Sequence, residues 1–288
     1  MENRGCGTLY VVATPIGNLE DITLRALRVL KSVDLIAAEN VRHTRGLCEH
    51  YGIQSRLVGY NQHNQKAKAQ SLIQGLESGK DLALVTDAGT PGISDPGAYL
   101  INRAALQGIK ITPLPGPSAV MSALSVSGLP AEGFVFVGFL PNKPGKRKKT
   151  LRELISETRT MVFFEAPHRI HAMLADIMEI LGDRRIVMVR EMTKIFEEVK
   201  SGPVSSILEH LAEERIRGEF TLVLAGADVE KKAPGLSDAA LNRIEELLNS
   251  EEEMSVKDIA LRISREQGLP YRRVYKECLM RKKSSSPN

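Results

Sequence analysis

The 288-residue sequence has no tryptophan, only three cysteines and no apolar run long enough to cross a membrane. Cys6, Cys48 and Cys278 lie far apart and form no Cys-x-x-Cys pair, which argues against a disulfide framework or a cysteine-rich zinc site. The apolar run at residues 9–13 is too short for the core of a signal peptide. We therefore expect a cytoplasmic protein with free thiols and no membrane association.

Several motifs of common cofactor and catalytic sites are also absent. The first predicted strand is not followed by Gly-x-Gly-x-x-Gly, and no Walker loop occurs, which argues against dinucleotide binding and a P-loop NTPase. A Gly-x-Ser-x-Gly hydrolase motif is missing as well. The six histidines are scattered and form no His-x-x-x-His pair, so we expect no catalytic metal.

Short apolar segments alternate with helical patterns along most of the chain. The first series of predicted strands covers residues 9–13, 33–38, 56–60, 82–86 and 109–114, and the second covers 134–140, 160–164, 185–190 and 220–226. This alternation is typical of sheets covered by helices. We predict an N-terminal α/β domain at residues 1–127 and a second α/β domain at 128–230, with breaker-rich residues 127–133 at the boundary.

The last part of the sequence contains helical patterns only. Ser255 and Asp258 form a capping pattern that precedes a helix, and Gly268 with Pro270 ends it. Its apolar face consists of Val256, Ile259, Ala260 and Ile263. From Met254 onward nine Lys or Arg residues stand against three acids. We predict a basic, helix-turn-helix-like extension at residues 235–284.

Three predicted strands of the first series end in loops of small residues. These loops are TPIGNLED at residues 14–21, TDAGTPGISDPG at 86–97 and PLPGPSAV at 113–120. Ligands of open α/β sheets bind beyond the carboxyl ends of the strands. Gly and Pro also occur in ordinary tight turns, so a single such loop is weak support for a site. Three of them in one domain predict a common ligand cleft.

Four segments together resemble the tetrapyrrole-methylase superfamily over about the first 230 residues: VVATPIGNLEDITLRAL, LVTDAGTPGISDPG, PLPGPSAVMSALSVSGLP and FFEAPHRI. Members of this superfamily have two unlike α/β domains with a cofactor cleft between them. ATPIGNLEDIT and DAGTPGISDPG are similar to its branch of small-subunit ribosomal RNA methyltransferases, which 2′-O-methylate a cytidine in the decoding region of 16S ribosomal RNA. Residues 13–17 and 87–91 depart from the Gly-x-Gly-Pro-Gly and Gly-Asp-Pro motifs of the tetrapyrrole enzymes, which weakens a corrinoid interpretation.

The resemblance implies S-adenosylmethionine as the cofactor, a homodimer, and small-subunit ribosomal RNA or the 30S subunit as the partner. Matched by position, the cofactor-binding residues that it implies are Asp87, Ala88, Gly89, Thr90, Pro91, Ile93, Ser94, Asp95, Ser118, Ala119, Val120, Phe164, Ala225 and Gly226. The sulfonium of the cofactor is already a strong electrophile, so the protein mainly has to bury it and align the attacking oxygen. This chemistry needs no metal.

A ribose hydroxyl must lose its proton during the attack, which calls for a general base or an oriented water. Glu165 and Glu191 each follow a predicted strand of the second domain, and Lys194 lies three residues further on. Alternatively, Glu165 and Arg169 only form an ion pair near a helix start, and Lys194 holds a phosphate. The choice of base among Glu165, Glu191 and Lys194 is left open.

Clusters of basic residues predict the RNA-binding surface. Residues 142–152 carry six Lys or Arg and no acid, and four more, Arg42, Arg45, Lys66 and Lys68, follow predicted strand ends. Charge runs are often only solvated loops, but together with the resemblance they favour RNA. The predicted RNA-binding residues are Lys143, Lys146, Arg147, Lys148, Lys149, Arg169, Arg272 and Arg273. A tetrapyrrole methyltransferase and a non-catalytic RNA-binding factor are the alternative functions.

Overall fold

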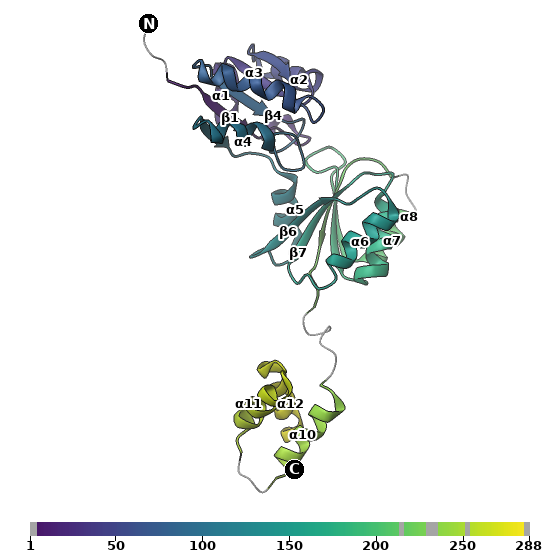
Figure 1. Cartoon of the computed structure of the whole chain (residues 1–288). Coiled ribbons are helices and arrows are strands. Elements are labelled where there is room, and N and C mark those ends of the chain that lie inside the picture. The colour runs from purple at the N-terminus through teal and green to yellow at the C-terminus, as the bar shows by residue number, and fades with distance from the viewer. Residues whose placement is uncertain (1–4, 213–215, 229–235, 251–253, 285–288) are drawn as a thin grey trace. The chain divides into compact units, whose positions relative to one another are not determined.

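A computed structural model of the chain describes residues 5–212, 216–228, 236–250 and 254–284 (Figure 1). The chain divides into two compact units, Met1–Ala227 and Asp228–Asn288. The described part of the first unit contains two five-stranded sheets, and that of the second contains helices only. No described helix is long and apolar enough to cross a bilayer. The finer division into residues 1–127, 128–230 and 235–284 stays a prediction.

The first sheet is parallel throughout and has the strand order β3-β2-β4-β1-β5. Its strands are β1 (Thr8–Val12), β2 (Leu35–Ala38), β3 (Arg56–Gly59), β4 (Leu82–Val85) and β5 (Lys110–Leu114). All four residues of the central strand β4 are buried, because helices cover both faces of the sheet. All five strands therefore carry their carboxyl ends to the same edge.

Two helices cover each face of the first sheet. Side chains of α1 (Leu24–Ser32) and α2 (Val41–Tyr51) share one core cluster with Val12 and Val85. Side chains of α3 (Gln65–Glu77) and α4 (Ala98–Leu106) share the other with Leu9 and Leu84. A 3₁₀ turn, η1 (Leu19–Asp21), precedes α1. The predicted doubly covered α/β sheet is confirmed.

The second sheet is mostly antiparallel and has the order β6-β7-β10-β8-β9, in which only β6 and β7 pair in parallel. Its strands are β6 (Phe134–Phe139), β7 (Thr160–Glu165), β8 (Arg185–Arg190), β9 (Glu198–Pro203) and β10 (Phe220–Leu224). The sequence patterns did not predict β9. Its sequence EVKSGP has no apolar run, and no residue of this edge strand is fully buried.

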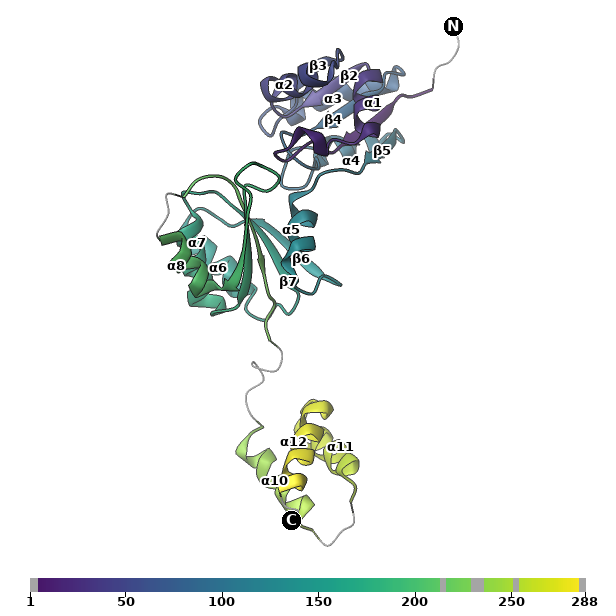
Figure 2. The ribbon, with the colours of Figure 1, turned by 180° about the vertical axis from the view of Figure 1, so that it is seen from behind.

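Helices also cover both faces of the second sheet (Figure 2). On one side lie α6 (Pro144–Glu153), α7 (Ile170–Leu181) and α8 (Val204–Ala212), which pack on the core cluster that contains Phe163 and Leu222. On the other side α5 (Ala119–Ser127) packs its Val120 and Leu124 against Val223. The predicted boundary at residue 127 thus follows a helix that packs with the second sheet.

The second unit consists of α10 (Asp238–Leu248), α11 (Val256–Gln267) and α12 (Tyr271–Ser284). The Ser255 side chain accepts a hydrogen bond from the Asp258 N–H, and Gly268 ends α11 in the left-handed conformation. These contacts confirm the predicted cap and the predicted end of this helix. The core cluster of the unit contains Ile244, Ile263 and other residues between 236 and 278.

The basic helix α6 is not uniformly exposed. Arg147 is only 4% exposed, and its Nε lies 2.6 Å from Oδ2 of Asp176 on α7. Lys148 contacts the same carboxylate at 3.5 Å and Glu179 at 2.6 Å. The predicted role of Arg147 in RNA binding is therefore wrong: a guanidinium buried between two helices and paired there cannot reach a phosphate. Lys143, Lys146 and Lys149 are exposed.

Replacing Arg147 with methionine should destabilise the protein strongly, because it leaves the largely buried carboxylate of Asp176 without its closest partner. We expect the free energy of unfolding to fall by about 3–5 kcal/mol in urea denaturation. Lys149→Met, the matched change at an exposed position of the same helix, should leave stability nearly unchanged. If the Arg147→Met protein had normal stability but reduced RNA affinity, Arg147 would have to contact RNA after all.

Candidate active site

Two loops at the carboxyl edge of the first sheet are tied together through their backbones. Thr14, which follows β1, and Gly89, which follows β4, exchange two N–H···O hydrogen bonds of 2.9 Å. The Thr14 hydroxyl also donates to the carbonyl of Thr86 at 3.0 Å. Gly89 has a φ of 79°, a conformation that favours glycine. The two small-residue loops therefore form one continuous rim.

The loop after β1 also packs on a loop of the second sheet. A Cβ atom on Gly17 would lie 2.6 Å from Cγ of Lys194 and 2.9 Å from the carbonyl oxygen of Met192. Both contacts are closer than atoms can approach, so only glycine permits this packing. Met192 follows β8, and the contact joins the rim of the first sheet to the edge of the second.

A cavity of about 440 Å³, here called the two-sheet cavity, lies between this rim and the second sheet. The loops after β1 and β4 contribute Ile16, Ala88, Gly89, Thr90, Ile93, Ser94 and Asp95, and the start of α5 contributes Ser118, Ala119 and Val120. Its second-sheet side is lined by Phe139, Phe164, Glu165, Ala166, Pro167, Val189, Met192, Glu219, Phe220 and Thr221. Apolar walls with a few polar groups are typical of sites for organic cofactors.

Ten of the fourteen predicted cofactor residues line this cavity, and four do not. Asp87 lines a neighbouring cavity, and Pro91 is buried and lines neither cavity. Ala225 and Gly226 lie at the opposite end of β10, where the Ala225 N–H donates to the Arg185 carbonyl. They lie away from the cavity because β10 runs antiparallel to β7.

The antiparallel direction of β10 brings other residues to the cavity. Phe220 pairs with Glu165, and Thr221 pairs with Phe164, so the start of β10 lies beside the end of β7. Sequence patterns identified the strand but contained no signal for its direction or register. Met192 and Ile16 were missed as well, since their placement depends on the loop contact at Gly17.

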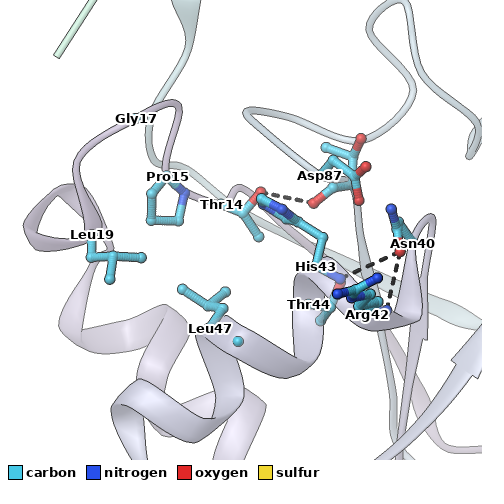
Figure 3. A pocket seen from close by; sticks show the side chains of 12 residues that line it. Thr14, Pro15, Gly17, Leu19, Asn40, Arg42, His43, Thr44, Leu47 and Asp87 are labelled. Atoms are coloured by element: carbon cyan, nitrogen blue, oxygen red, sulfur yellow. Dashed lines mark hydrogen bonds between the residues drawn. The ribbon is translucent and has the colours of Figure 1, made fainter. Parts of the chain in front are cut away.

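The second cavity, called the first-sheet cavity, has a volume of about 550 Å³ and lies at the carboxyl edge of the first sheet (Figure 3). Its lining consists of Thr14, Pro15, Gly17, Leu19, Asn40, Arg42, His43, Thr44, Gly46, Leu47, Thr86 and Asp87. Asn40 caps α2, with Oδ1 accepting from the N–H groups of Arg42 at 3.1 Å and His43 at 3.3 Å. The imidazole of His43 extends from the start of this helix toward Thr14.

Three carboxylates lie close to the rim that the two cavities share. Oε2 of Glu39 accepts hydrogen bonds from the Thr86 hydroxyl at 2.5 Å and from the Asp87 N–H at 3.3 Å. Burial and the charge of Glu39 raise the pKa of Asp95 to about 6 and also raise that of Asp87. Within the described ranges no group of three or more His, Cys, Asp or Glu side chains could hold a metal ion.

Glu165 is the one candidate for the general base that lines a cavity. Its Oε1 accepts from the Ala166 N–H at 2.9 Å and lies 3.2 Å from Nε of Arg169. Its Oε2 is buried without a hydrogen-bond partner, and burial raises the pKa of the carboxyl. Arg169 also donates to the Leu140 carbonyl and is only 16% exposed in its side chain; its role in RNA binding stays a prediction.

Glu191 and Lys194 pair with each other outside both cavities. Nζ of Lys194 lies 2.8 Å from Glu191 and 3.1 Å from Glu219, and Glu191 accepts a further bond from the Glu219 N–H. The hydrogen bond from Lys194 lowers the pKa of Glu191. Glu191 has a φ of 49°, and its bonds fix the loop that reaches Gly17. This geometry suits a structural role.

Comparison with known proteins gives a match to the family model described as Tetrapyrrole (Corrin/Porphyrin) Methylases over residues 8–208. The chain is 50% identical over 224 residues to the ribosomal RNA small subunit methyltransferase I of Xylella fastidiosa, covering 77% of this chain and 82% of that protein. It is 40% identical over 282 residues to the protein of the same name from Pseudomonas aeruginosa, covering 97% and 99%.

Solved structures with low sequence identity share the fold. The methyltransferase CobJ aligns with a TM-score of 0.59 at 18% identity, covering 77% of this chain and 95% of that one. A uroporphyrin-III C-methyltransferase from Thermus thermophilus, complexed with S-adenyl homocysteine, aligns with a TM-score of 0.53 at 19% identity, covering 75% and 97%.

The raised pKa of Asp95 predicts a pH-dependent effect of Asp95→Asn. The native state favours the protonated form of Asp95. The stability that this preference contributes is fully present below the pKa of the unfolded state, near 4, and is lost as the pH rises through the folded-state pKa of about 6. The advantage of the asparagine variant over the wild type should therefore grow by roughly 2 kcal/mol between pH 4.5 and pH 8. Denaturation of both proteins at each pH measures this stability difference. An equal difference at the two pH values would show that Asp95 is already ionised at the lower pH.

Proposed function

Because the chain belongs to the tetrapyrrole (corrin/porphyrin) methylase family, we propose that it transfers a methyl group from S-adenosylmethionine to small-subunit ribosomal RNA, at the ribose 2′-oxygen of a cytidine in the decoding region. Two relatives named ribosomal RNA small subunit methyltransferase I support the RNA substrate, and one of them matches nearly the whole chain. The structural observation that carries the proposal is the two-sheet cavity, which the small-residue loops of the first sheet and the edge of the second sheet enclose.

The two-sheet cavity suits a cofactor with a large organic body and a positive charge. Phe139, Phe164 and Phe220 supply apolar surface. The ring centroids of Phe139 and Phe164 lie 5.6 Å apart. Asp95 and the unpartnered Oε2 of Glu165 supply negative charge. A sulfonium placed near these carboxyls would stabilise their ionised forms. When bound there, S-adenosylmethionine supplies the activated methyl group, and the loops exclude water from it.

The three candidates for the general base, Glu165, Glu191 and Lys194, lie in different surroundings. We propose that Glu165 holds the charged cofactor, because it lines the cavity that the cofactor would fill. Glu191 and Lys194 neutralise each other, and we propose that they fix the loop after β8 in its contact with Gly17. The proton acceptor is then to be sought elsewhere on the shared rim.

Exposed basic residues of both units are proposed to contact RNA phosphates. Lys143 directly precedes α6, Lys146 and Lys149 lie on it, and Arg272 on α12 is exposed as well. Lys148 and Arg273 are half-buried, and Lys148 already bridges two acids of α7. Binding through phosphates should weaken steeply as salt increases.

The partner, the cellular location and the oligomeric state belong to the same proposal. We propose the 30S subunit or its ribosomal RNA as the partner, the cytoplasm as the location and a homodimer as the active form. Exposed apolar side chains on α5, Met121 at 55% and Val126 at 54%, are consistent with a face that a second copy covers. Light scattering of the purified protein would measure its mass in solution.

Methyl transfer to the proposed nucleotide can be measured directly. Small subunits from cells that lack the modification are incubated with the protein and labelled S-adenosylmethionine, and the labelled nucleotide is mapped by nuclease digestion. We expect a single 2′-O-methylcytidine in the decoding region. Label on a base, at another site, or only on an added tetrapyrrole would contradict the proposal.

Deleting residues 228–288 should separate RNA binding from cofactor binding. The second unit has its own core cluster, so the first unit should keep its fold and its affinity for S-adenosylmethionine. Affinity for the small subunit should fall, and the slope of its logarithm against log salt should become shallower by about one for each phosphate that the shortened protein no longer neutralises. Calorimetry and filter binding measure the two affinities. An equal fall in both would indicate a structural role for the second unit.

A further inference from the structure

We propose that the first-sheet cavity holds the acceptor nucleoside of the RNA, and that His43 accepts the proton of its ribose 2′-hydroxyl while Asp87 stabilises the resulting imidazolium. This inference rests on the function proposed above. It assigns a role to a cavity in which Asp87 was predicted as a cofactor contact and His43 was given no role.

The two cavities lie on opposite sides of the same pair of loops. Along the loop after β4, Asp87 lines the first-sheet cavity and Ala88 lines the two-sheet cavity. Along the loop after β1, Pro15 and Gly17 line the former and Ile16 lines the latter. The hydrogen-bonded backbones of these loops form the wall between them. A donor in one cavity and an acceptor in the other would therefore meet at a single shared rim.

The size and lining of the first-sheet cavity suit a nucleoside. Its volume of about 550 Å³ lies within the range of small-molecule sites. Leu19 and Leu47 offer apolar contact for a base. Asn40, Arg42 and His43, at or near the start of α2, offer polar groups for a ribose and its phosphate. A cavity with such a lining can accept a nucleotide that has been turned out of the RNA stack.

His43 has the chemistry that the proton transfer requires. It is the one imidazole among the described residues that line either cavity, and its side chain is exposed to incoming substrate. Imidazole is the side chain whose ordinary pKa allows it to accept a proton near neutral pH. A ring nitrogen without a proton can therefore act as a general base toward a hydroxyl.

Asp87 lies where it can stabilise a protonated His43. Its Oδ1 is buried without a hydrogen-bond partner. Burial and Glu39 raise the pKa of this carboxyl, and the charge of His43 lowers it. The charged groups that line the cavity together with His43 are Asp87, from the loop after β4, and Arg42 of its own helix, while Glu39 accepts from the Asp87 N–H. A carboxylate beside an imidazole favours the imidazolium that forms during general-base catalysis.

The reaction balances without any further reagent. The O–H bond of the ribose breaks as the new O–CH₃ bond forms, and the proton passes to the free ring nitrogen of His43. The electron pair of the S–CH₃ bond stays on sulfur, which leaves neutral S-adenosylhomocysteine. The imidazolium then returns its proton to water.

His43→Gln tests the assignment, with His50→Gln as the matched control. His50 lies on the same helix, is exposed and packs its ring against Tyr51 outside the cavity. We expect His43→Gln to lower kcat for small-subunit methylation by about 10²- to 10³-fold and to remove the acidic limb of the pH profile. The affinity for S-adenosylmethionine should change less than about twofold, and His50→Gln should behave as the wild type.

Asp87→Asn provides a second, independent measurement. Removal of the carboxylate should lower kcat, because the imidazolium that forms during the transfer loses its stabilising charge. Normal kcat in His43→Gln, or an equal fall in cofactor affinity and activity, would overturn the inference. If the wild type forms the expected 2′-O-methylcytidine while His43→Gln is fully active, only the inference fails. If the wild type forms no such product, the proposed function fails and the inference fails with it.

Discussion

The pair of backbone hydrogen bonds between Thr14 and Gly89 is the contact on which both cavities depend. It joins loops that follow β1 and β4, two neighbouring strands of the first sheet. Because each loop contributes some residues to one side and others to the other side, one wall separates two cavities and lines both. Small residues are needed here for packing, since Gly17 touches the loop after β8 and Gly89 adopts a positive φ.

Charge distribution makes the shared rim suitable for methyl transfer. Glu39, Asp87 and Asp95 lie near one another, and burial keeps the pKa values of both aspartates raised. Glu165 approaches from the second sheet with one oxygen unpartnered. A cationic methyl donor would relieve this accumulation of negative charge, and it loses its charge when the methyl group leaves. Under the proposed function, these carboxylates favour the sulfonium of the cofactor over the neutral thioether of the product.

The sequence patterns predicted the elements better than their spatial relations. Apolar runs identified the strands that carry the site, and the loops of small residues identified many of the residues that line the two-sheet cavity. The placement of Ala225 and Gly226 away from the cavity was not predicted, because strand direction in the second sheet depends on long-range pairing. Arg147 looked like part of a solvated basic run, whereas its partner Asp176 lies on another helix. His43 was not predicted to belong to the ligand cleft, since it is far from Asp87 in the sequence and lines the same cavity only through the parallel sheet.

The central claim is that the two-sheet cavity holds the cofactor and leaves the first-sheet cavity for the acceptor. A crystal structure of the protein with S-adenosylhomocysteine tests it most directly. The account predicts the adenosyl group between the loop at Ser118 and the ring of Phe164, with the sulfur directed toward the shared rim near Asp95. Electron density for the ligand beside Asn40 and His43, with the two-sheet cavity empty, would contradict it.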